Sequence, residues 1–185
     1  MTNQTASPTR AGQDNAPQGG EHSHILVVFA DDRHGALDRI VGLLRRRRAN
    51  MQTLTIGRSE VPNVVRITVM MSDSEVGVDQ LVEQLRKIVD VRRVVNLSSE
   101  QAVSRELALI KVNSGVSQQP EIIELGHLFG AHPVDMDQET VTFEVTGSTD
   151  KVEKLVEQLQ PYGVREVART GCLAMTRGSG ISEAV

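Results

Sequence analysis

The chain of 185 residues has little of the material on which several classes of protein depend. Its single cysteine, Cys172, cannot form an internal disulfide or a cysteine-cluster metal site, which favours a reducing compartment, the cytoplasm. Three Phe, one Tyr and no Trp leave few rings for stacking on bases, and a formal net charge of −4 provides no basic face. No apolar run approaches membrane-spanning length. We therefore expect neither nucleic acid nor a membrane as a partner.

Signs of catalysis are also missing from the sequence. It contains no Gly-rich phosphate loop, no nucleophile elbow and no pair of acids placed for acid–base chemistry. Its histidines do not follow a metal-ligand spacing. Cys172 lies in an apolar strand, which favours a core position over a nucleophile. We expect no catalytic residue, no metal site and no cofactor in this chain.

Apolar spacing predicts one order of elements twice. In the first half, strands are predicted at residues 24–30, 51–59, 63–71 and 91–98. Two helices are predicted between them, one on the stripe Leu37, Ile40, Val41 and Leu44, the other on the stripe Val78, Leu81, Val82, Leu85, Ile88 and Val89. The second half repeats this order, with strands at 106–114, 131–137, 139–147 and 165–176. Its helices are predicted at 120–129 and on Val152, Leu155, Val156 and Leu159, the latter capped by Thr149 or Asp150.

This order predicts an α+β protein with two ferredoxin-like βαββαβ domains. Each would place two helices on one face of a four-stranded antiparallel sheet, so that a neighbouring domain or a second subunit would cover the other face. We assign residues 23–99 and 106–178 to the two domains and 100–105 to a linker. Residues 1–22, which have neither a signal-peptide nor a transit-peptide pattern, and residues 179–185 are expected to be tails, the first of them disordered.

The segment Asp31-Asp32-Arg33-His34-Gly35 joins the first strand to the first helix. The backbone N–H groups at a helix start lack intrahelical partners, and the helix dipole favours a carboxylate there. Gly35 would allow close approach to the backbone, and Asp32 could accept a hydrogen bond from an ammonium group. These features describe an amino-acid site. Alternatively, Asp32 only caps the helix and Gly35 only relaxes the turn.

Longer segments resemble one protein family. The segment HILVVFADDRHGALDRIVGLLRRRRANMQTLTI resembles the start of the small, regulatory subunits of acetolactate synthase (acetohydroxyacid synthase). PNVVRITV, LRKIVDVRRVVNL, SRELALIKV and VARTGCLAMTRG extend the similarity from about His24 to Gly178. One departure is Asp32, where the family commonly has Asn.

The resemblance implies an N-terminal ACT domain and a second domain of similar topology. It implies homodimers that pair through their ACT domains and bind valine or a related branched-chain amino acid at the interface. The effector loop of one subunit would contain Asp32, His34, Gly35, Ala36 and Leu37, and the partner would contribute Asn50 and Met51. The chain itself would not be an enzyme.

By the same resemblance, the chain is expected to activate a large catalytic subunit of branched-chain amino acid biosynthesis. It would also make that subunit sensitive to feedback inhibition. That transferase subunit is expected to carry thiamine diphosphate, Mg²⁺ and FAD. The alternative is a free-standing ACT-domain sensor of amino acids that regulates another enzyme or transcription. An RNA-binding ferredoxin-like module is disfavoured by the scarce aromatics and acidic charge.

Overall fold

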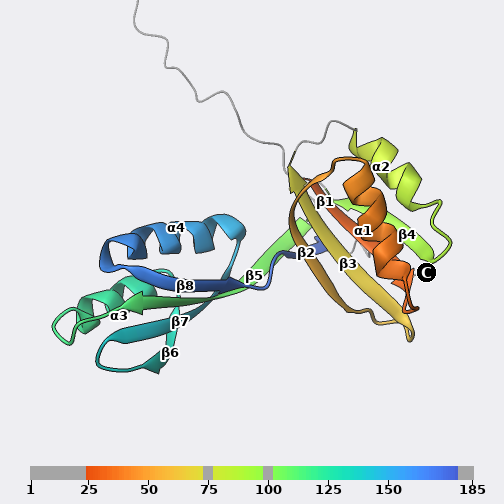
Figure 1. Ribbon diagram of the computed structural model, residues 1–185. Coiled ribbons are helices and arrows are strands. Elements are labelled where there is room, and N and C mark those ends of the chain that lie inside the picture. The colour runs from red at the N-terminus through yellow and green to blue at the C-terminus, as the bar shows by residue number, and fades with distance from the viewer. Residues whose placement is uncertain (1–23, 73–76, 98–101, 179–185) are drawn as a thin grey trace, which may run out of the picture.

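The structure is a computed structural model that describes residues 24–72, 77–97 and 102–178 (Figure 1). The tails expected at 1–22 and 179–185 lie outside the described residues, as do residues 100 and 101 of the expected linker.

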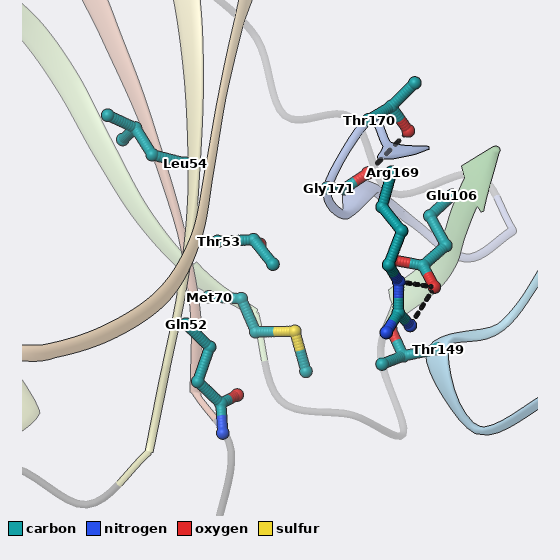
Figure 2. Close-up of a pocket in the computed structure, with 9 residues that line it drawn as sticks. All are labelled: Gln52, Thr53, Leu54, Met70, Glu106, Thr149, Arg169, Thr170 and Gly171. Carbon is teal, nitrogen blue, oxygen red and sulfur yellow. Dashed lines mark hydrogen bonds and ion pairs between the residues drawn. The ribbon is translucent and has the colours of Figure 1, made fainter. Parts of the chain in front are cut away.

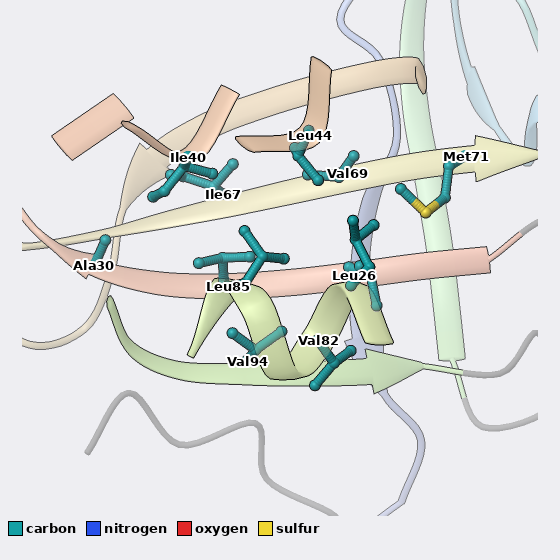
Figure 3. Close-up of a cluster of buried hydrophobic side chains, with 12 residues drawn as sticks. Leu26, Ala30, Ile40, Leu44, Ile67, Val69, Met71, Val82, Leu85 and Val94 are labelled. Carbon is teal, nitrogen blue, oxygen red and sulfur yellow. The ribbon is translucent and has the colours of Figure 1, made fainter. Parts of the chain in front are cut away.

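The first half of the chain forms a four-stranded antiparallel sheet with two helices on one face. Its elements are β1 (His24–Asp31), α1 (Ala36–Arg46), β2 (Asn50–Arg58), β3 (Val64–Ser72), α2 (Val78–Leu85) and β4 (Val91–Leu97). The strand order is β2-β3-β1-β4. Alternate residues of β1 and β3 face the helices, so Leu26 and Val69 lie in one core with Leu44 of α1 and Val82 of α2 (Figure 3). The alternation seen in the sequence therefore builds this core.

The second half repeats the plan. It contains β5 (Ala102–Asn113), α3 (Gln119–Leu128), β6 (His132–Met136), β7 (Thr140–Gly147), α4 (Thr149–Leu159), the short 3₁₀ helix η1 (Gln160–Tyr162), β8 (Val164–Arg169) and β9 (Leu173–Thr176). Strands β6-β7-β5-β8 lie in the same relative order as in the first half. Ile110 and Phe143 of the sheet pack with Ile122 of α3 and Leu155 of α4 in a second core. The predicted pair of ferredoxin-like α+β units is confirmed.

The two halves are joined by β5, which is long enough to take part in both. Its C-terminal part pairs with β7 and β8, whereas Ala102–Arg105 pair with β9. Ala102, Cys172 and Ala174 pack on Val27 and Phe29, on the face of the first sheet that the helices leave bare. The neighbouring part of the same chain therefore covers that face, and from Ala102 the expected linker is β-strand.

Two helix predictions were wrong in detail. Helix α2 ends at Leu85, and i to i−3 hydrogen bonds, such as that from the Ile88 N–H to the Leu85 carbonyl, turn the following residues. Val89, placed in the helical stripe, is 88 % exposed as a result. Helix α4 is capped by Ser148, whose Oγ accepts from the N–H of Lys151, and not by Thr149 or Asp150.

The predicted strand 165–176 is also wrong, because it is two strands. Gly171 has a φ of +83°, and the chain turns there from β8 to β9. A Cβ at Gly171 would lie 2.9 Å from Thr55 Oγ1, so this turn packs tightly on β2. The turn at Gly171 thus carries the chain from β8, beside the C-terminal part of β5, to β9, beside the N-terminal part of β5.

Candidate functional site

The β1–α1 loop ends at Gly35, which precedes the first helical residue. Gly35 has a φ of +80° and a ψ of −4°, the left-handed conformation that favours glycine. No side chain caps the helix, so the interpretation of Asp32 as a capping residue is wrong. The alternative interpretation also proposed that Gly35 relaxes the turn, and this left-handed turn does favour a glycine.

The hydrogen bonds of this loop leave part of its backbone unused. The N–H of Asp32 donates to the Asn63 carbonyl over 2.9 Å, and that of Arg33 donates to the Asp31 carbonyl over 2.9 Å. The N–H of Ala36 donates to the Arg33 carbonyl over 3.2 Å. Within the part of the chain that the structure describes, the N–H groups of His34, Gly35, Leu37 and Asp38 have no acceptor. These four groups surround the start of α1, where the helix dipole adds positive potential. Unbonded donors at the start of a helix are groups that suit a small carboxylate.

Charged side chains surround the loop. Arg92 Nε donates to Asp31 Oδ1 over 2.6 Å, and Arg39 donates to the buried Asp90 carboxylate. The Arg39 guanidinium also lies 3.0 Å from where a Cβ on Gly35 would stand. Asp32 is exposed and has no ion-pair partner among the described residues, so it is free to accept from an ammonium group. The loop thus offers donors and an acceptor for opposite ends of a zwitterion.

The predicted loop residues differ in what they present. His34 and Leu37 are exposed, and Leu37, 39 % exposed, is an apolar surface beside the unused N–H groups instead of part of the core stripe. Ala36 is buried and its N–H is already bonded. The buried stripe of α1 is Ala36, Ile40 and Leu44.

Asn50 and Met51 lie at the other end of the sheet. Asp31 pairs with Val64, at the start of β3, whereas Asn50 pairs with Ser72, at its end. Eight residues of strand separate these positions, which is about 26 Å. Asn50 Nδ2 donates to Ser72 Oγ over 2.7 Å, and Met51 packs against the first core. One chain therefore brings five of the seven predicted residues together but not the other two.

The structure also contains a crevice that the sequence reasoning missed. It has a volume of about 510 Å³ and lies between β2 and β3 on one side and the second half on the other (Figure 2). Its lining residues are Gln52, Thr53, Leu54, Met70, Glu106, Thr149, Arg169, Thr170 and Gly171. The one signal in the sequence is Glu106, an acid in register with the buried apolar positions Ala108, Ile110 and Val112 of its strand.

Comparison with known proteins gives the family. The model of the small subunit of acetolactate synthase matches residues 105–178, and that of the AHAS small subunit-like ACT domain matches residues 26–93. The acetolactate synthase small subunit of Bacillus subtilis is 41 % identical over 84 % of this chain and 91 % of its own length. The chain belongs to the acetolactate synthase small subunit family. The Mycolicibacterium smegmatis small subunit is 38 % identical, over 86 % of this chain and 94 % of its own.

A solved structure agrees with the shared fold. The crystal structure of the small subunit from Thermotoga maritima superposes with a TM-score of 0.78 at 31 % identity, covering 85 % of this chain and 99 % of that one. As a small subunit of acetolactate synthase, the protein is a regulatory rather than a catalytic subunit, and its implied partner is the large catalytic subunit.

The described residues contain neither a metal-binding cluster nor a membrane-spanning helix. Among residues 24–72, 77–97 and 102–178, no group of three or more His, Cys, Asp or Glu side chains could hold a metal ion. None of the helices described is both long and apolar enough to cross a membrane.

Proposed function

We propose that this small subunit activates the thiamine-diphosphate-dependent large subunit of acetolactate synthase and gives it feedback inhibition by valine or another branched-chain amino acid. Thiamine diphosphate, Mg²⁺ and FAD belong to the large subunit, and the setting is branched-chain amino acid biosynthesis in the cytoplasm. The observation that supports an effector role most is the Gly35 turn, which leaves four backbone N–H groups unused at the start of α1.

The effector would lie across this turn. Its carboxylate accepts from the N–H groups of Gly35 and Leu37, and its ammonium group donates to Asp32. Its aliphatic side chain packs beside Leu37. Because Asn50 and Met51 lie about 26 Å from the loop in one chain, they reach the effector from a second copy. The site is then completed by a homodimer of ACT domains.

A site of this kind is strong enough for metabolite sensing. Millimolar to micromolar affinity requires about −4 to −8 kcal/mol, within reach of a few amide bonds, one charge contact and a small apolar surface. If effector binding fixes the placement of two ACT domains, a coupling of about 1 to 3 kcal/mol changes the activity of the large subunit about 5- to 150-fold.

The experiment is reconstitution with the large subunit while valine, leucine and isoleucine are titrated. A rise in acetolactate formation on adding the small subunit tests activation, and its fall with effector tests inhibition. No rise with the wild-type chain would contradict the proposal and favour a free-standing sensor.

Two variants of Gly35 locate the inhibitory site. Gly35→Asp and Gly35→Asn have side chains of the same shape, and both Asp and Asn tolerate the left-handed conformation better than other residues. They differ in the negative charge that Gly35→Asp places beside the carboxylate. We expect both variants to activate, but Gly35→Asp to need far more effector for inhibition than Gly35→Asn. Equal inhibition of the two would contradict the site.

A further inference from the structure

The crevice between the two halves has two chemically different walls. On the sheet side are Gln52 and Thr53 of β2 and Met70 of β3, whose thioether extends toward the opposite wall (Figure 2). On the other side are Glu106, Thr149 and Arg169, from β5, α4 and β8. Its volume of about 510 Å³ is in the range of sites for small molecules, which occur preferentially between domains.

A buried carboxylate with a free oxygen faces this space. The Glu106 side chain is 1 % exposed, and both of its hydrogen bonds from Arg169 are accepted by one oxygen, Oε1. Its Oε2 receives no hydrogen bond from the described residues. Oε2 is not among the fully buried atoms that lack a partner, so it is open to the crevice, where a hydrogen bond from a ligand would stabilise its charge. The described residues therefore donate hydrogen bonds to only one of the two carboxylate oxygens of Glu106.

The charge around Glu106 favours a cation. Arg169 also donates through its Nη1 to Glu153 Oε2, over 2.7 Å. One guanidinium thus serves two carboxylates, which leaves the three side chains with a net charge of −1. An ammonium group at Oε2 would neutralise this cluster and supply the missing hydrogen bond.

Next to this acceptor lie groups that suit a carboxylate. Thr149 lies beside the Arg169 guanidinium and is the first residue of α4, an 11-residue helix (Figure 2). Ser148 Oγ accepts only from the Lys151 N–H, so the N–H groups of Thr149 and Asp150 have no acceptor among the described residues. The Thr149 hydroxyl and the two N–H protons that Arg169 has not used are further donors.

We propose that the crevice is a second small-molecule site, which binds a free α-amino acid with its ammonium group on Glu106 Oε2 and its carboxylate at Thr149 and Arg169. The amino-acid side chain lies along Met70 and the methyl groups of the lining threonines. This site is separate from the Gly35 loop and does not depend on it. Gln52, which lines the crevice, directly follows Met51, so the crevice adjoins the residues assigned to the effector site of a second copy.

The test uses the full chain with ¹³C-labelled methionine methyl groups and ¹⁵N-labelled amides. Valine, leucine and methionine, all as L-isomers, are titrated separately to about 10 mM, ten times the weakest dissociation constant of interest, about 1 mM. We expect at least one of them to shift the Met70 methyl and the Thr149 and Gly171 amides saturably, and to do so equally in Gly35→Asp. The Met136 methyl, on β6, is an internal control.

Two comparisons test the chemistry. 4-Methylpentanoate lacks the ammonium group of leucine and 3-methylbutylamine lacks its carboxylate, and neither should reproduce the saturable shifts. Thr149→Val removes one hydroxyl at constant shape and should weaken binding about three- to tenfold, whereas Thr146→Val, on an exposed position of β7, should not. The absence of a Met70 shift with all three amino acids, or equal binding of either fragment, would overturn the proposal. Because the Gly35 and Leu37 amides report the other site separately, failure of one site is distinguished from failure of the other.

Discussion

Arg39 of α1 and Asp90, which precedes β4, form a close ion pair. Arg39 Nε lies 2.7 Å and its Nη2 lies 2.5 Å from Asp90 Oδ2. The Asp90 side chain is buried, and its backbone carbonyl accepts from the N–H of Asp31, the last residue of β1. The pair therefore connects both ends of the Gly35 loop to the start of β4.

Breaking this pair should cost stability. Arg39→Gln leaves the Asp90 carboxylate buried without its cation, which costs about 3–5 kcal/mol when both partners are buried. Because Arg39 is half exposed, water compensates in part, and we expect the free energy of unfolding to fall by about 1–3 kcal/mol. Arg45→Gln, on an exposed position of the same helix, should change it by less than about 0.5 kcal/mol. Urea unfolding measures both, and equal values would contradict a structural role for the pair.

Titration of the Cys172 thiol should lower the free energy of unfolding at alkaline pH. Burial, with a smaller contribution from the charge of Glu106, raises the pKa of its thiol above the ordinary value of 9.0. The unfolded chain therefore loses this proton at a lower pH than the folded chain. The thiol's contribution to stability is complete below the pKa that it has in the unfolded chain. The contribution declines as the pH rises from that value to the higher pKa of the folded chain.

The matched variant is Cys172→Ala, which has no thiol to titrate. We expect the difference in unfolding free energy between wild type and variant to be constant up to about pH 8 and to shrink as the pH rises above 9.0. A difference that does not change with pH would show that the thiol titrates alike in both states.

Mixed dimers should recover effector sites that both parents lack. Gly35→Asp damages the loop and Asn50→Asp damages the residue assigned to the second copy, so neither homodimer should bind valine at the Gly35 loop. In a mixed dimer, one site carries both changes and the other carries neither. Random pairing makes half of the dimers mixed, so about a quarter of all sites should return. Equilibrium dialysis counts them as the labelled valine bound in excess of that bound by either parent homodimer, and no excess would contradict a shared site.

Much of the fold could be predicted because local spacing agrees with burial. Ile67, Val69 and Met71 alternate along β3, and all three are buried in the first core. The same reasoning failed at Val89, because apolar spacing continues past Leu85 while the backbone turns to bring Asp90 to Arg39. The position of a partner 51 residues away cannot be read from a local pattern.

Both candidate sites also depend on tertiary contacts that a local sequence pattern does not show. Gly35 at the start of a helix suggested a binding loop, but the number of unused N–H groups depends on the carbonyl of Asn63, which comes from a distant turn. The crevice depends on the pairing of Glu106 with Arg169 and on the turn at Gly171, both set by tertiary contacts. Neither pairing leaves a periodic signal in the sequence.

In the proposed effector site, backbone donors at the Gly35 turn bind the carboxylate of a branched-chain amino acid. The most direct measurement is the ¹H–¹⁵N spectrum of the full chain titrated with L-valine and, separately, with isobutylamine, which lacks the carboxylate. New hydrogen bonds to the amides of Gly35 and Leu37 should move their proton resonances downfield and saturably with L-valine but not with isobutylamine. Saturable binding of L-valine that leaves both amides unmoved would contradict the account.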